Sequence, residues 1–150
     1  MLRLGALDLS PKSLLATQLP SVAEKYGGFY EIWEQLFEHA RASSTSVDLG
    51  GVHLQAIELV RYSPLDGHYP TADELNELDG LVISGSGEDS WNSTPWLVEL
   101  RKMIAEYDAV GVKMSGFSFA PQVIAEALVR LLSSFHLHTW YYMQYVCPRL

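Results

Sequence analysis

The sequence predicts a doubly wound α/β domain, in which helices cover both faces of a parallel sheet. Short apolar runs alternate with helix-forming segments four times along the 150 residues. These runs are continuously apolar, as strands buried on both faces are, and do not alternate with polar residues. The pattern is typical of flavodoxin-like sheets, whose functional residues lie at the carboxyl ends of the strands.

The apolar runs locate the strands of this sheet. We expect strands over residues 2–8, 52–62, 80–84 and 109–114, because each run is short and bounded by turn-forming residues. Residues 10–20 lie between Pro11 and Pro20 and are expected to form a loop.

Three features mark the helices. Residues 29–42 carry apolar side chains at helical spacing, namely Ile32, Trp33, Leu36, Phe37 and Ala40. Thr71 and Glu74 have the spacing of a capping box, which begins a short helix to about residue 78. Thr94 and Pro95 fit the N-cap and first position of another helix. That helix has an apolar face formed by Leu97, Leu100, Met103, Ile104 and Tyr107.

The most informative segment runs from Gly116 to Gln122 and reads Gly-Phe-Ser-Phe-Ala-Pro-Gln. It follows the last predicted strand and precedes a helix over residues 123–129. A turn of small residues between strand and helix is the geometry of a nucleophile elbow, which lifts its central side chain out of the sheet. The central residue here is Ser118.

Four blocks of sequence resemble the class I glutamine amidotransferase family, and in particular its small stand-alone members. These blocks are Lys25-Tyr26-Gly27-Gly28 with the following aromatics, residues 79–87, residues 95–97 and the elbow with its helix. The resemblance covers residues 2–130. At the elbow the family carries Gly-x-Cys-x-Gly-His-Gln; Gly116 and Gln122 match, whereas Ser118, Ala120 and Pro121 replace the Cys, Gly and His.

The resemblance implies a set of site residues. Ser118 takes the place of the nucleophile, and backbone N–H groups from Gly85, Ser86, Gly87 and Phe119 take the place of the oxyanion donors. Gln122 matches a glutamine that lines the substrate pocket. Because a serine hydroxyl ionises far less readily than a thiol, Ser118 depends on a base. The family's His and Glu come well after the elbow, in a region that this chain does not contain, so we expect impaired activity.

Composition excludes several other classes. Ten basic and eighteen acidic side chains give a net charge of −8 without a Lys/Arg cluster, so we expect no nucleic-acid partner. No apolar run is long enough to span a membrane, and no signal peptide is evident. The single Cys147 fits a reducing compartment, and we expect a cytoplasmic protein. No metal site or cofactor is expected, since Glu88 and Asp89 lack further ligands.

The last twenty residues differ from the rest. Between residues 131 and 150 the only charged side chain is Arg149, and five residues are aromatic. We therefore expect a partial amidotransferase-like domain over residues 1–130, with a sheet truncated after the elbow helix, and a divergent aromatic tail over residues 131–150.

Three functions follow from these residues and this resemblance. The first is an amidotransferase-like protein that hydrolyses glutamine and supplies ammonia to a synthase or other biosynthetic partner, with impaired activity in this chain. The second is a non-catalytic binding module, a pseudoenzyme that contacts such a partner. The third is a serine hydrolase that uses Ser118, because Gly-x-Ser-x-Ala is close to Gly-x-Ser-x-Gly.

Overall fold

A four-stranded parallel sheet forms the centre of the computed structural model, which describes residues 1–43 and 56–128. Its strands are β1 (Leu2–Leu7), β2 (Ile57–Tyr62), β3 (Gly80–Ile83) and β4 (Met114–Gly116). They lie in the order β2-β1-β3-β4, and all three pairings are parallel. The flavodoxin-like prediction is therefore confirmed, and the sheet has the strand order expected for it.

The strand order reverses between β1 and β3. From β1 the chain crosses to β2 on one side, and from β2 it crosses back to β3 on the other side. The register aligns Leu7 with Ile83 and Ile83 with Gly116, so β1, β3 and β4 end side by side. Ligands of such sheets bind in the crevice outside the carboxyl ends at this point.

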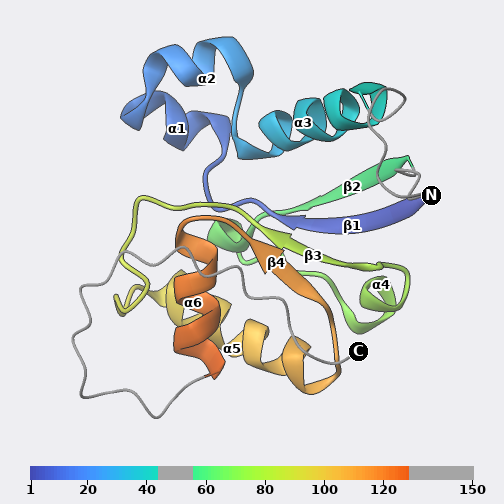
Figure 1. Cartoon of the computed structure of the whole chain (residues 1–150). Coiled ribbons are helices and arrows are strands. Elements are labelled where there is room, and N and C mark those ends of the chain that lie inside the picture. Colours follow the sequence, from blue (N-terminus) through green and yellow to red (C-terminus); the bar gives the residue numbers. More distant parts are fainter. Residues whose placement is uncertain (44–55, 129–150) are drawn as a thin grey trace.

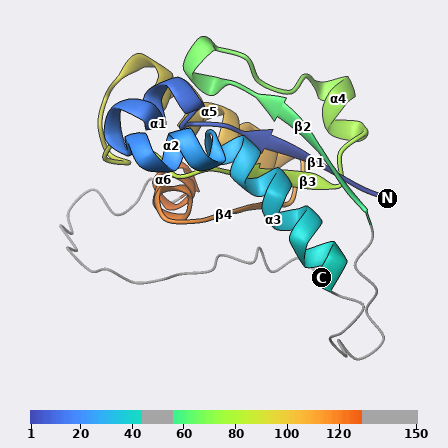
Figure 2. The same ribbon diagram turned by 90° about the horizontal axis from the view of Figure 1, so that it is seen from above.

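Helices cover both faces of the sheet (Figures 1 and 2). One face carries α1 (Lys12–Gln18), α2 (Pro20–Tyr26) and α3 (Phe29–Ser43). The other carries α5 (Pro95–Ala109) and α6 (Phe119–Leu128). A short 3-10 turn, η1 (Pro64–Asp66), and the helix α4 (Ala72–Asn76) join β2 to β3.

The main core lies between the sheet and the α5–α6 layer. The predicted apolar face of α5 is buried here through Leu97, Leu100 and Ile104, while Met103 is half-buried. These side chains pack against Leu7, Leu9, Tyr62, Ile83, Phe119, Ala120, Val123 and Ile124. Because its first residues are buried in this core, the start of α6 is held in place, and so is the elbow that precedes it.

The capping box predicted at Thr71 is present. The Thr71 amide donates to Glu74 Oε2 at 2.7 Å, and the Glu74 amide donates to Thr71 Oγ1 at 3.3 Å. The pKa of Glu74 is lowered most by the bond from the Thr71 amide and next by a bond from the Thr71 hydroxyl, which donates to Glu74 Oε2 at 2.8 Å. At the start of α5, Thr94 and Pro95 hold the predicted positions, but the Thr94 side chain caps no backbone N–H.

The loop predicted over residues 10–20 was wrong, because helix α1 occupies most of it. Pro11 is the N-cap of α1 and Pro20 is the first residue of α2. Proline is favoured at helix starts, where the missing N–H would be unpaired anyway. The two prolines therefore begin two helices.

The fourth strand was predicted too early in the chain. Helix α5 continues to Ala109, and the chain turns at Gly111, whose φ is +81°, before β4 begins at Met114. The elbow helix correspondingly begins at Phe119. The second strand is confirmed from Ile57 to Tyr62, and its predicted start at 52–55 lies outside the described residues.

The tail predicted over residues 131–150 lies outside the described residues, and so does the loop over residues 44–55. Across residues 1–43 and 56–128, no helix has the length and apolar character needed to cross a membrane.

Candidate functional site

Ser118 occupies the turn between β4 and α6. Gly116 ends the strand and Phe119 begins the helix, so Phe117 and Ser118 make the whole connection. Ser118 has a φ of +59°, and it is the one residue other than glycine with a positive φ in the described part of the chain. A left-handed backbone is strained for a residue with a Cβ, and such strain gathers at functional sites. The residue is exposed, as an elbow nucleophile must be.

The loop after β3 lies beside Ser118. A Cβ built on Gly85 would be 3.9 Å from the Ser118 Cβ. Gly85 is buried, Ser86 is half-buried and Gly87 is exposed, so the loop rises from the sheet towards solvent. The structure therefore brings Ser118 together with the first of the predicted oxyanion residues.

The backbone N–H groups of all four predicted oxyanion donors, Gly85, Ser86, Gly87 and Phe119, have no acceptor within the described ranges. Phe119 is the first residue of α6, where helix geometry leaves N–H groups free. Unpaired donors beside a nucleophile can stabilise an oxyanion. The Phe119 side chain is buried in the core, and Gln122 lies exposed on the first turn of α6.

Helices α1 and α3 supply two site neighbours that sequence reasoning missed. Phe29 Cζ would be 3.5 Å from a Cβ on Gly85, and Gln18 Nε2 would be 2.7 Å from a Cβ on Gly87. Phe29 therefore flanks Gly85 together with Ser118, and the Gln18 amide lies against the outer part of the same loop. The aromatic after Gly27-Gly28 was a usable signal for Phe29, but nothing in the sequence indicated Gln18.

A cluster of charges holds the Gly28–Phe29 segment in place. Arg61 on β2 donates to Asp8 Oδ2 at 2.6 Å and to Glu31 Oε1 at 3.1 Å. Glu31 Oε2 accepts the Gly28 N–H at 2.7 Å, and the Phe29 N–H donates to the Ser10 carbonyl at 3.3 Å. Burial raises the pKa of Asp8, which is 1% exposed, and the positive charge of Arg61 opposes that rise.

Within residues 1–43 and 56–128, no side chain forms a hydrogen bond with the Ser118 hydroxyl, the contact by which a general base takes a proton. His39 and His68 are exposed, and the His68 ring contacts Tyr62 at a centroid distance of 5.4 Å. In the same ranges no three His, Cys, Asp or Glu side chains are grouped so that they could hold a metal ion. His136 and His138 lie outside the described residues.

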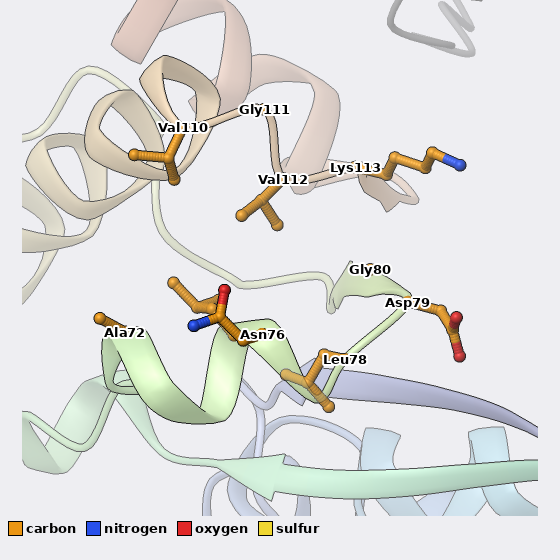
Figure 3. A pocket seen from close by; sticks show the side chains of 10 residues that line it. Ala72, Asn76, Leu78, Asp79, Gly80, Val110, Gly111, Val112 and Lys113 are labelled. Carbon is orange, nitrogen blue, oxygen red and sulfur yellow. The ribbon is translucent and has the colours of Figure 1, made fainter.

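A cavity of about 350 Å³ lies at the opposite edge of the sheet (Figure 3). It is lined by α4, by the residues that lead into β3 and by the α5–β4 turn, including Asn76, Gly80 and Val112. In Figure 3 the charged ends of Asp79 and Lys113 point away from the enclosed space. The cavity thus lies at the amino ends of β3 and β4, away from the elbow, and offers no converging charges.

Comparison with known proteins finds relatives over most of the chain. Gamma-glutamyl peptidase 4 of Arabidopsis thaliana is 29% identical over 114 residues, which are 75% of this chain and 39% of that protein. Gamma-glutamyl peptidases 3 and 2 of the same plant are each 28% identical over 103 residues, which are 69% of this chain. The match covers 35% and 36% of those two proteins.

The chain therefore spans between 35% and 39% of the length of these relatives. No protein-family model matches it, and no solved structure matches it. The similarity to gamma-glutamyl peptidases agrees with the resemblance to class I glutamine amidotransferases.

Proposed function

We propose that this chain carries a site for γ-glutamyl amides, with Ser118 at the nucleophile position of an amidotransferase-like hydrolase. The observation that carries the proposal is the left-handed Ser118 beside Gly85, at the carboxyl edge where the strand order reverses. The relatives are named gamma-glutamyl peptidases, and this name suggests γ-glutamyl amides as the substrate class. Glutamine is the simplest γ-glutamyl amide.

The chemistry of such a site is acyl transfer. The Ser118 oxygen would attack the γ-carbonyl carbon and pass its proton to a base, and the carbonyl oxygen would become an oxyanion. The N–H groups of Ser86 and Phe119 would stabilise that charge. The amine would leave with a proton, and water would then hydrolyse the ester to release glutamate and the free serine.

Turnover should be weak in this chain. The Ser118 hydroxyl has no partner among the described residues, and an unassisted hydroxyl is a poor nucleophile at neutral pH. This observation favours the second candidate, a binding module that recognises γ-glutamyl amides without hydrolysing them. A synthase or biosynthetic partner that receives ammonia, and a cytoplasmic setting, belong to the same proposal.

Binding and turnover can be measured on the same set of proteins. Calorimetry with glutamine and with a γ-glutamyl dipeptide measures binding, and release of ammonia or of the amino acid measures turnover. We expect both compounds to bind the wild type. Ser118→Cys should raise turnover, because a thiol ionises more readily, and Ser118→Ala should abolish whatever turnover the wild type shows.

Ser115→Ala serves as the matched control, because Ser115 is an exposed serine on β4, three residues before Ser118. Absence of binding by both γ-glutamyl compounds, in folded wild-type protein, would contradict the proposed function. Binding without turnover in every variant would favour the binding module. Labelling of Ser118 by a fluorophosphonate would favour a serine hydrolase.

A further inference from the structure

We propose that Ser10 and Ser84 are positioning residues that orient the Gly85–Ser86 peptide, so that the Ser86 N–H faces the reacting carbonyl. This inference rests on the proposed function and adds two residues to it. Both serines are buried, with exposures of 1% and 0%. Ser10 follows β1 and Ser84 follows β3, so they converge from two neighbouring strands on the same carbonyl group.

Both hydroxyls donate to the carbonyl oxygen of Gly85. The distances are 3.0 Å from Ser10 Oγ and 3.1 Å from Ser84 Oγ. A carbonyl oxygen can only accept, so each hydroxyl must turn its hydrogen towards Gly85. Both lone-pair positions of this oxygen are thereby occupied within the buried side of the loop.

Other bonds fix the two serines themselves. Ser84 Oγ accepts the Leu9 N–H at 2.7 Å, and the Ser10 N–H donates to Asp8 Oδ1 at 3.1 Å. Asp8 is in turn held by Arg61 at 2.6 Å. The hydroxyls are therefore parts of a buried polar network, and buried networks of this kind restrict their members to one arrangement.

The direction of the Gly85 carbonyl determines the direction of the next N–H. In a trans peptide the C=O and N–H bonds point to opposite sides of the chain, and no peptide bond in the described residues is cis. Since the Gly85 carbonyl points to the buried hydroxyls, the Ser86 N–H points away from them. That N–H has no acceptor in the described residues, and exposed Ser118 lies beside Gly85, with its Cβ 3.9 Å from a Cβ built on that glycine.

The peptide after Gly85 needs these two hydrogen bonds to keep its orientation. Gly85 has no Cβ, so rotation of the following peptide meets little steric resistance. A reversed peptide would present the carbonyl oxygen to an oxyanion and repel it. Two hydroxyl donors from separate strands oppose that reversal, and a donor that is already oriented needs no reorganisation during the reaction.

A boronic acid analogue of glutamate, 2-amino-4-boronobutanoic acid, separates orientation from simple binding. Its boron stands in place of the γ-carbonyl carbon. The Ser118 oxygen forms a bond to boron, its proton is released, and the tetrahedral boron carries a negative charge. The adduct therefore needs the oriented N–H, whereas glutamine binds with an uncharged carbonyl.

We expect Ser10→Ala and Ser84→Ala to weaken boronate binding by about tenfold, below the 10²–10³ effect of deleting an oxyanion donor. Affinity for glutamine should stay within about twofold of the wild-type value, because ground-state contacts are unchanged. Ser10→Thr keeps the hydroxyl and should retain boronate binding. Ser13→Ala, an exposed serine on α1, is the control that should change neither affinity.

Two results would overturn the inference while leaving the proposed function intact. One is boronate affinity that stays at the wild-type value in both alanine variants. The other is an equal loss of boronate and glutamine affinity, which would indicate a structural role alone.

A measurement without ligand keeps the inference testable if the wild type binds neither compound, a result that would contradict only the proposed function. The carbonyl 13C resonance of Gly85 should move upfield in each alanine variant, since it loses a hydrogen bond, and the Gly87 resonance should not move. An unchanged Gly85 resonance in both variants would show that the two hydroxyls do not orient the Gly85 carbonyl, and it would overturn the inference.

Discussion

Gly116 and Ala120 meet at the base of the elbow, where a Cβ on Gly116 would overlap the Ala120 methyl. The same Cβ would lie 2.6 Å from the Ile83 carbonyl oxygen, so backbone blocks it on the other side. Ala120 is fully buried and cannot retreat. The close approach of β4, β3 and α6 at this point therefore requires glycine at position 116.

Gly116→Ala should destabilise the protein and displace the elbow. Overpacking a well-packed site costs about 1–3 kcal/mol, and the obstructing atoms here include main chain, which cannot rotate aside. Urea denaturation would measure the loss. Ser115→Ala, one residue earlier and exposed, should stay within about 0.5 kcal/mol of wild type. Equal stability of the two variants would show that the elbow can open to admit a methyl group.

Ser118→Gly should be more stable than Ser118→Ala. The φ of +59° costs a residue with a Cβ about 1–2 kcal/mol. Glycine avoids that cost but gives the unfolded chain extra freedom worth about 0.4–1 kcal/mol. We therefore expect a net gain of about 0.5–1 kcal/mol, measured by thermal or urea unfolding. A glycine variant no more stable than the alanine variant would mean that the turn is unstrained.

Removal of Arg61 should increase the dependence of stability on pH that arises from Asp8. In Arg61→Leu, the opposing positive charge is gone and burial raises the pKa of Asp8 further above its ordinary 3.8. The folded state then binds a proton more tightly than the unfolded state. Stability is therefore retained at pH below 3.8 and is lost as pH rises through the folded-state pKa.

The magnitude follows from the exposure of Arg61. Removing one partner of a buried ion pair leaves the other charge unpaired and lowers the free energy of unfolding by about 3–5 kcal/mol. Because the Arg61 side chain is 38% exposed, we expect a smaller loss at pH 7, about 1–3 kcal/mol. The 13C titration of the Asp8 carboxyl group would measure its pKa. The double variant with Asp8→Asn should lose the pH dependence, and a single variant without it would contradict this account.

Local sequence patterns predicted the elements whose signals are local. The apolar runs predicted four strands, and the spacing of Thr71 and Glu74 predicted a capping box that the structure contains. The errors came from residues that are compatible with two different local structures. Pro11 and Pro20 can bracket a loop or begin helices, and composition alone does not distinguish the two.

Contacts between distant residues account for what the sequence could not show at the site. Ser118 was identified as the centre of an elbow that follows a strand, and the resemblance to class I glutamine amidotransferases added the Gly85 loop. Their roles stay predictions. The bond from Ser10 to Gly85 joins residues 75 positions apart, and it depends on the strand order and register. A serine after a strand is too common to indicate such a bond.

Arg101 should control the order of the loop that continues from the Gly85 segment. Its guanidinium donates to the carbonyls of Ser90 and Asn92 at 2.6 and 2.9 Å, on either side of Trp91. Ser90 is 2% exposed, whereas Trp91 is 60% exposed. The fork of Arg101 thus fixes both flanks of an exposed aromatic side chain, a geometry that the single ammonium of lysine cannot reproduce.

Arg101→Met keeps the aliphatic stem and removes both charged donors. Net hydrogen bonds to charged groups are worth about 1.5–3 kcal/mol when buried, and Arg101 is only half-buried. We therefore expect a loss of about 1–2 kcal/mol, concentrated in this loop because local opening needs less free energy than global unfolding. Amide exchange should accelerate at Asn92, whose N–H donates to the Asp89 carbonyl. Lys102→Met changes an exposed neighbour that pairs with Glu99 on the helix surface, and it should leave that exchange rate unchanged. The same exchange rate at Asn92 in both variants would show that the loop keeps its order without the guanidinium.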